Sequence, residues 1–232
     1  MLKNIKRIQG TIDYQTPYHW KVSGVSREIQ MQRLRFAQKY IARSDSVLDV
    51  GCGDGFLTNV LSESCKHVVG VDSSQTGISL ANSLVDTSKV NFVLGSVNNL
   101  PFKENAFDVI TLFEVIEHIP IESVKKALMD IKRILKKHGI LIITTPNPRN
   151  FSNIIFGRRM VSKKHEREYR PAELLQLLSD FQKIEVSGIY FPLPPLTLLY
   201  KSRYRFLWQV LFPLAGLFPK LARFITYCGR GK

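Results

Sequence analysis

The sequence lacks the features of a secreted or membrane-spanning protein. Its three cysteines, Cys52, Cys65 and Cys228, are too few for a disulfide framework and indicate a reducing compartment. The apolar run at residues 206–219 has 14 residues, whereas a spanning helix needs roughly 20. The first ten residues contain no apolar run of the kind found in a signal peptide. We therefore expect a cytoplasmic protein.

Acidic residues are scarce at both ends of the chain. The formal net charge of +14 divides into +6 for residues 1–45, −1 for residues 46–149 and +9 for residues 150–232, and no acid follows Glu185. A near-neutral middle between two basic ends indicates an anionic partner, either a membrane surface or a nucleic acid. The alternative is that the cations only keep the chain soluble.

Short apolar runs alternate with helical patterns through the middle of the chain. Such alternation predicts an α/β protein whose parallel sheet is covered on both faces, and right-handed crossovers make the sheet doubly wound. The predicted strands are residues 46–50, 67–72, 90–95, 107–113 and 139–145, and the predicted helices are residues 25–43, 55–64 and 122–138.

The clearest helical pattern covers residues 122–138. Its apolar residues, from Val124 to Leu135, recur at the spacing of one helix face. Lys136 and Lys137 suit the negative end of the helix dipole, and Gly139 is placed to end the helix.

The first predicted strand runs into a glycine-rich turn, LDVGCGDGF. In open α/β sheets, ligands bind beyond the carboxyl ends of the strands. Gly51, Gly53 and Gly55 allow a tight turn and a close approach of a ligand to the backbone. A dinucleotide fingerprint is excluded because Phe56 stands where that motif needs its third glycine. Asp49 places a carboxylate inside an apolar strand, which favours a cationic ligand.

The second predicted strand ends in Asp72, about 20 residues after the loop, where an acid can bond both ribose hydroxyls of a nucleotide-like ligand. Asp72 could instead only cap the next helix, because Asp-Ser-Ser is a common helix start. The order of loop and acid favours ribose binding.

Four motifs of the chain resemble, in order, the motifs of class I S-adenosylmethionine-dependent methyltransferases. They are VLDVGCGDG, VVGVD, LPFKENAFDVI and GILIITTPNP. FEVIEHI and HEREYRPAELLQLL are similar to the ubiquinone-biosynthesis O-methyltransferase group and its small-molecule relatives. The resemblance implies a Rossmann-like methyltransferase fold, with a seven-stranded, mostly parallel sheet whose last strand is antiparallel. Residues 184–191 and 221–228 suit the last two strands.

The resemblance also implies S-adenosyl-L-methionine as cofactor and assigns residues to its methionine portion. Asp49, Gly51 and Gly53 would surround that portion, with Cys52 in the same loop. The backbone carbonyl of Phe113 would meet the methionine amine.

Further residues match the positions that bind the nucleoside portion. Asp72 would hold the ribose, and Ser73 would lie near the adenine. Ser96 and Val97 match the positions that flank the adenine ring. Relatives commonly have an aspartate in place of Ser96, so a serine would accept more weakly from the adenine amino group.

FEVIEHI, residues 113–119, follows the fourth predicted strand and allows three interpretations. Glu114 and Glu117 could cap and charge the first turn of the next helix, with His118 hydrogen-bonded locally. His118 could be a general base for a substrate hydroxyl, because histidine titrates near neutral pH. A divalent metal could orient a catechol-like substrate through Glu114, Glu117 or His118. The spacing is a weak metal signature and HExxH is absent, so no metal ligand is assigned and His118 is the catalytic candidate.

The basic tail contains a predicted insertion at residues 192–219. Its aromatic residues, such as Trp208, and its cations suit a segment lying on an anionic membrane. The tyrosines and cations assigned to this interface are Tyr200, Tyr204, Lys201, Arg203 and Arg205. The alternative is a lid packed over the substrate or a dimer face.

The sequence therefore predicts a basic N-terminal helical segment, residues 1–45, and a methyltransferase domain, residues 46–232. We expect methyl transfer to an oxygen of a lipid-like or lipid-linked small molecule, with peripheral docking on the cytoplasmic face of a membrane. One alternative is an RNA methyltransferase, which only the basic net charge of the chain favours. Another is a non-catalytic lipid-binding module with a vestigial cofactor site.

Overall fold

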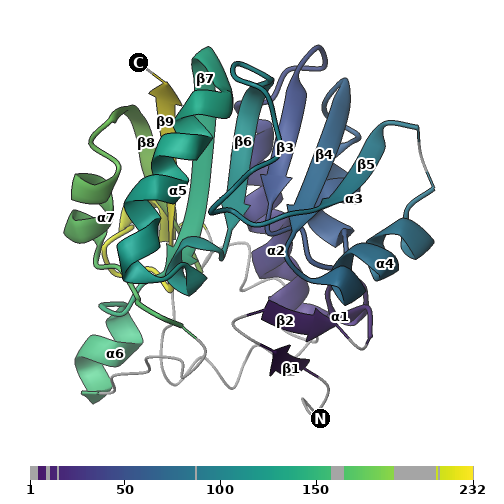
Figure 1. Cartoon of the computed structure of the whole chain (residues 1–232). Coiled ribbons are helices and arrows are strands. Elements are labelled where there is room, and N and C mark those ends of the chain that lie inside the picture. The colour runs from purple at the N-terminus through teal and green to yellow at the C-terminus, as the bar shows by residue number, and fades with distance from the viewer. Residues whose placement is uncertain are drawn as a thin grey trace.

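A seven-stranded sheet with helices on both faces forms the centre of the molecule (Figure 1). The computed structural model describes residues 5–8, 11–14, 16–86, 88–157, 165–190, 213 and 215–231. The strands of the sheet are β3 (Ser46–Val50), β4 (His67–Asp72), β5 (Val90–Leu94), β6 (Phe107–Phe113), β7 (Leu135–Pro146), β8 (Phe181–Ile189) and β9 (Phe224–Gly231). The helices are α1 (Tyr18–Lys21), α2 (Gly24–Gln38), α3 (Phe56–Leu61), α4 (Gln75–Leu84), the 3₁₀ helix η1 (Ile116–His118), α5 (Ile121–Ile134), α6 (Phe151–Phe156) and α7 (Pro171–Leu177).

The strand order is β5-β4-β3-β6-β7-β9-β8. Strands β3 to β7 pair in parallel, and β9 is antiparallel to both β7 and β8. The predicted doubly wound, mostly parallel sheet with an antiparallel last strand is confirmed. The order reverses between β3 and β6, and ligands of such sheets bind at this switch point.

Alternate residues of the central strands pack against opposite helical layers, as the two-residue period of a strand requires. Val47 and Val109 join the core under α2, whereas Leu48 and Ile110 join the core under α5. Both sets are almost completely buried. The two layers fix the ends of β3 and β6 from both sides, which gives the loops after them a rigid base.

The helix predicted at residues 122–138 is shorter than expected. α5 ends at Ile134, and the chain passes directly into β7, where Leu135 pairs with Phe107. Gly139 therefore lies inside a strand, and the prediction that it ends the helix was wrong. Lys136 Nζ lies 2.8 Å from Asp108 Oδ2 instead of serving the helix dipole. Sheet pairing and burial of Leu135 outweigh the helical pattern here.

The N-terminal part contains more than the predicted helix. Strands β1 (Ile5–Ile8) and β2 (Thr11–Tyr14) form an antiparallel hairpin that the sequence did not predict. α2 ends at Gln38, five residues before the predicted end at residue 43. The proposed boundary between residues 45 and 46 stays a prediction.

Most of the predicted insertion at residues 192–219 lies outside the described residues, including Trp208, Tyr200, Tyr204, Lys201, Arg203 and Arg205. Within the described part of the chain, no helix is long and apolar enough to cross a membrane.

Candidate active site

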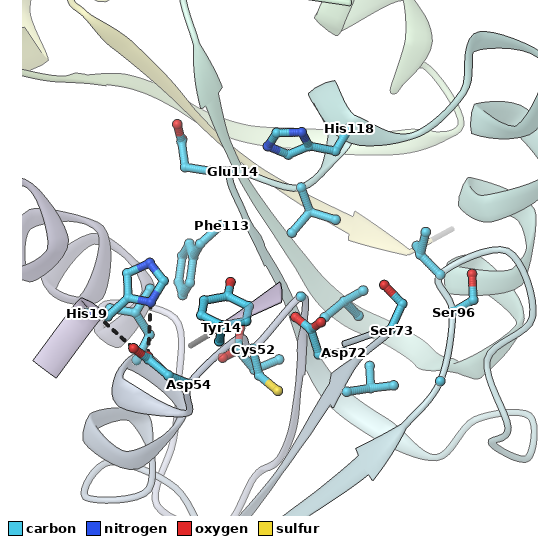
Figure 2. Close-up of a pocket in the computed structure, with 18 of the residues that line it drawn as sticks. Tyr14, His19, Cys52, Asp54, Asp72, Ser73, Ser96, Phe113, Glu114 and His118 are labelled. Atoms are coloured by element: carbon cyan, nitrogen blue, oxygen red, sulfur yellow. Dashed lines mark hydrogen bonds and ion pairs between the residues drawn. The ribbon is translucent and has the colours of Figure 1, made fainter. Parts of the chain in front are cut away.

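A cavity of about 270 Å³ opens at the carboxyl ends of β3, β4 and β6, at the switch point of the sheet. Figure 2 shows side chains from the N-terminal segment, the glycine loop and the loops after β4, β5 and β6 around it. The predicted site residues that line it are Asp49, Gly51, Cys52, Asp72, Ser73, Ser96, Val97, Phe113 and His118. Gly53 does not line the cavity but hydrogen-bonds a residue that does. The structure thus brings the predicted residues together, while their individual roles stay predictions.

The glycine loop has a backbone that other residues rarely adopt. Gly51, Gly53 and Gly55 have φ values of +78°, +55° and +78°, in the left-handed region that favours glycine. A Cβ on Gly53 would also come within 2.5 Å of the hydroxyl oxygen of Tyr14. The loop therefore needs glycine both for its turn and for the close packing of the N-terminal segment over it.

Asp72 fastens this loop to the end of β4. Its Oδ2 accepts a hydrogen bond from Gly53 N and its Oδ1 accepts one from Ser74 N, each at 2.8 Å. Burial raises the pKa of Asp72, and these two backbone donors oppose the rise. The N-cap of α4 is Ser74, whose hydroxyl accepts from Gly77 N at 3.1 Å. The alternative that Asp72 is only a helix cap was therefore wrong.

Asp49 is buried at the floor of the cavity. Its carboxylate accepts hydrogen bonds from the hydroxyls of Thr58 at 2.6 Å and Thr111 at 2.8 Å. Burial raises the pKa of Asp49 to about 6, although both hydroxyls lower it. Asp49 thus ties β3 to α3 and β6, and it adds negative potential beside the place predicted for the methionine portion of the cofactor.

The N-terminal segment supplies a wall of the cavity that sequence reasoning missed. Tyr14 and His19 line it together with Asp54 of the glycine loop. Asp54 is fully buried, and it accepts from His19 N at 2.7 Å while its other oxygen lies 2.9 Å from His19 Nδ1. Trp20 Nε1 donates to the carbonyl of Asp54 at 2.9 Å. A cluster of aromatic and imidazole side chains just before the predicted first helix was the available signal.

The FEVIEHI segment does not begin a long helix. Glu114 has a left-handed backbone, with φ +59°, and η1 follows as a single turn. α5 starts only at Ile121, and its first-turn acid is Glu122. Neither acid caps a helix, so the capping part of that interpretation was wrong, whereas Glu117 does place its charge in the single turn of η1. Glu114 instead lies 3.3 Å from Arg33 Nη2 and accepts from Thr144 Oγ1 at 3.0 Å.

Glu117 is fully buried beside the cavity. Its Oε2 accepts from Thr145 Oγ1 at 3.1 Å, and its Oε1 has no hydrogen-bond partner among the described residues. Burial and the charge of Glu114 hold the pKa of Glu117 well above its usual range. A buried carboxylate with one unsatisfied oxygen is costly unless a further donor or cation reaches it.

Two imidazoles complete an acid–imidazole cluster, defined as Glu117, His118 and His165. One ligand atom of each lies within 4.8 Å of those of the other two. The rings of His118 and His165 meet edge to face at 5.0 Å. The backbone carbonyl of Glu117 accepts from Glu166 N at 2.8 Å, which holds the HEREYR segment against η1. His165 was missed as a site residue, although it opens a motif that carries the resemblance.

The acid–imidazole cluster fits a divalent cation. One carboxylate and two imidazoles form a mixed N and O donor set of the kind that binds first-row transition metals. The carboxylate of Glu168 lies 2.8 Å from His165 Nδ1 and would orient that ring. A cation would also satisfy Glu117 Oε1. The metal interpretation of FEVIEHI thus gains support, with His165 in place of Glu114 as the third ligand.

Comparisons with known proteins agree with this geometry. A family model described as a methyltransferase domain matches residues 48–143. The ubiquinone biosynthesis O-methyltransferase of Glaesserella parasuis is 30% identical over 163 residues, which cover 62% of this chain and 68% of that protein. The chain belongs to the S-adenosylmethionine-dependent methyltransferase family. S-adenosyl-L-methionine is accordingly its cofactor, and the cavity lined by the predicted binding residues is the predicted cofactor cavity.

Two further matches show how much of the chain is similar to known methyltransferases. A probable S-adenosylmethionine-dependent methyltransferase of Mycobacterium tuberculosis is 29% identical over 167 residues, and the chain spans only 58% of its length. The N-methyltransferase NodS of Bradyrhizobium japonicum, solved with S-adenosyl-L-homocysteine, superposes with a TM-score of 0.64 at 17% identity. That superposition covers 94% of this methyltransferase and 93% of NodS, and it shows a shared fold.

Proposed function

We propose that this methyltransferase transfers the methyl group of S-adenosylmethionine to an oxygen of a lipid-like or lipid-linked small molecule at a membrane surface. The observation that carries the proposal is the acid–imidazole cluster, whose His118 also lines the cofactor cavity. The sulfonium already activates the methyl group, so the protein must align the acceptor oxygen and help it lose its proton. The cluster supplies both at one edge of the cavity.

The cluster favours an oxygen acceptor with a cation at its side. A divalent cation held by Glu117, His118 and His165 would orient an acceptor hydroxyl and lower its pKa. Glu117 contributes a buried carboxylate whose Oε1 has no hydrogen-bond partner in the described part of the chain, and Glu168 orients His165. The second candidate is that His118 alone takes the proton as a general base, which needs no cation.

Described residues also support the membrane part of the proposal. Ile154 and Ile155 of α6 are 54% and 58% exposed, and Leu217 and Phe218 are 71% and 53% exposed. We call these four residues the apolar patch. Its two segments are neighbours, because the backbone N–H of Phe151, at the start of α6, donates to the carbonyl of Leu221 at 2.9 Å.

The position of the apolar patch suits delivery of a membrane-dissolved acceptor. α6 lies beyond the carboxyl ends of the parallel strands, the end at which the cavity opens (Figure 1). Exposed large apolar side chains within a strongly basic part of the chain are typical of membrane-lying surfaces. The Glaesserella parasuis relative is named an O-methyltransferase of ubiquinone biosynthesis, which supports oxygen as the acceptor atom.

Label transfer tests the proposed reaction. The protein is incubated with methyl-labelled S-adenosylmethionine and either a membrane lipid extract or total RNA, with and without a chelator. We expect label in the lipid fraction, loss of transfer with chelator and recovery with added divalent cation. Label in RNA alone would favour the RNA methyltransferase alternative. No transfer, together with weak binding of S-adenosylhomocysteine in calorimetry, would favour the non-catalytic module.

A further inference from the structure

Two segments at the edge of the sheet are joined through one buried side chain, that of Asn147. Its Nδ2 donates to the carbonyls of Lys220 and Ala222, each at 2.9 Å, and its backbone N–H donates to the carbonyl of Arg223 at 2.9 Å. Asn147 is only 1% exposed. The loop after β7 and the chain that enters β9 therefore form one surface, at the carboxyl end of β7.

This surface carries cations and no acid. Arg149 comes from the loop after β7, and Lys220 and Arg223 come from the chain before β9, whereas residues 147–157 and 215–231 contain no Asp or Glu. Arg149 and Lys220 are exposed, and Arg223 is half-buried. Within the described part of the chain, none of these three side chains forms a hydrogen bond or an ion pair. The positive charge of the surface is thus unbalanced, which suits an anionic ligand.

Arg223 connects this surface to the cavity. It directly precedes β9, and the ring of Phe224 lies 4.8 Å from the guanidinium carbon of Arg33, which lines the cavity. Burial raises the pKa of Glu114, and the positive charges of Arg33 and Arg223 oppose the rise. Arg223 is therefore close enough to act on a carboxylate of the cavity wall. An anion bound at Arg223 would lie beside the acceptor side of the site.

The apolar patch lies on the same two segments. Ile154 and Ile155 follow Arg149 in the chain, and Leu217 and Phe218 precede Lys220. Exposed apolar side chains beside cations suit an amphiphile, because its chain packs on the apolar side chains while its anionic head group meets the cations. A nucleic acid would use the cations and leave the aliphatic side chains in water. The surface therefore favours an anionic lipid.

We propose that the methyl acceptor is a phosphate-bearing lipid whose phosphate group binds at Arg223, between Arg149 and Lys220. A guanidinium offers two parallel donors that match two phosphate oxygens. The methyl group passes from the sulfonium to a hydroxyl oxygen of this lipid, that hydroxyl loses its proton, and S-adenosylhomocysteine is the second product. The phosphate itself is unchanged and serves to orient the acceptor. The inference rests on the proposed function and narrows its acceptor from a lipid-like molecule to one with a phosphate.

Two soluble amphiphiles with the same chain test the phosphate site. Decyl phosphate carries the anion, and decyl maltoside carries a neutral head group. In calorimetry below the micelle concentration, we expect the wild type to bind decyl phosphate more tightly than decyl maltoside. Arg223→Gln should weaken decyl phosphate roughly tenfold or more and leave decyl maltoside and S-adenosylhomocysteine unchanged. Arg223→Lys should fall between the two, because it keeps the charge and loses the forked geometry.

Arg230→Gln is the matched control for these titrations. Arg230 is an exposed arginine of the same strand, and it pairs with Ile140 near the opposite end of β7. Its replacement removes the same charge from the chain without touching the proposed site. It should therefore bind decyl phosphate as the wild type does.

The charge of the labelled product tests the class of acceptor. Lipid that is labelled in the transfer assay is passed over an anion-exchange column and examined by mass spectrometry. We expect the label to be retained on the column and to belong to a phosphorus-containing lipid. Arg223→Gln should raise the KM for this lipid far more than it lowers kcat, because the phosphate orients the acceptor and takes no part in the transfer.

Four results would overturn the inference. Decyl phosphate that binds the wild type no more tightly than decyl maltoside would remove the phosphate site, and equal weakening by Arg223→Gln and Arg230→Gln would reduce it to net charge. Weakened binding of an RNA oligonucleotide by Arg223→Gln, with decyl phosphate unaffected, would assign the cations to nucleic acid. Label in a lipid that the column does not retain would refute the phosphate-bearing acceptor and leave the proposed function standing, whereas absence of label from every lipid would contradict the proposed function itself.

Discussion

Replacement of Asp72 by alanine should separate cofactor binding from folding. In the structure both carboxylate oxygens of Asp72 hold backbone N–H groups, from Gly53 and Ser74, at 2.8 Å. Each oxygen keeps a second lone pair, which can accept from a ribose hydroxyl. The substitution therefore removes two sets of charged hydrogen bonds, one to the ligand and one to the glycine loop.

The magnitudes differ for the two sets. Loss of the charged acceptor for the ribose should cost about 1.5–3 kcal/mol, or roughly ten- to a hundredfold in affinity. The two backbone donors belong to Gly53 and Ser74, which are buried and do not line the cavity, so loss of their acceptor should lower the free energy of unfolding by about 1–3 kcal/mol for each donor left unpaired. For a chain of this length each kcal/mol corresponds to a fall of about 2–4 °C in Tm. Asp72→Asn should lie between wild type and Asp72→Ala, because an amide keeps one acceptor oxygen.

Calorimetric titration with S-adenosylhomocysteine and thermal unfolding measure both effects on the same preparations. Asp86→Ala is a suitable control, because Asp86 is exposed beyond the far end of α4. It should change neither quantity. A folded Asp72→Ala protein that binds S-adenosylhomocysteine as tightly as wild type would refute the assignment of Asp72 to the ribose.

Three further predictions concern acidity, catalysis and docking. Burial raises the pKa of Asp49 to about 6, so folding binds protons between about pH 4 and pH 6 and wild-type stability falls as pH rises through this window. The free energy of unfolding of Asp49→Asn relative to that of the wild type, measured by urea unfolding, should therefore rise by up to about 3 kcal/mol from pH 4 to pH 7. A difference between the two proteins that does not depend on pH would contradict the raised pKa of Asp49. His118→Ala should lower turnover about 10²–10⁴-fold with little change in S-adenosylhomocysteine affinity, and a fully active variant would exclude both catalytic interpretations. Ile155→Ser combined with Phe218→Ser should weaken the part of binding to anionic vesicles that persists at high salt, as measured in a sedimentation assay. The control Ile184→Ser, at an exposed position of β8, should bind as the wild type does. Equal binding by the wild type, the double variant and the control would remove the apolar patch from the docking surface.

Local sequence signals determined the sheet and the position of the cavity at its edge. A buried strand, a loop with glycines at Gly51, Gly53 and Gly55, and an acid at the next strand end are each defined by a few adjacent residues. Their backbone and burial requirements act over that same short range. The strand pairing then follows from right-handed crossovers. For this reason the predicted strands and the cavity lining agree with the structure.

Only the tertiary structure decided where the helix before β7 ends and how the segments around Glu114, His118 and His165 meet. Leu135 has the spacing of a helical residue, but its burial against β6 places it in a strand. Glu114 looks like a helix-capping acid, yet its partner Arg33 comes from a helix far away in the sequence. His165 reaches His118 because a backbone hydrogen bond from Glu166 holds its segment against η1. These contacts depend on how distant segments cross at the edge of the sheet, and the periodicity of a short stretch carries no information about such crossings.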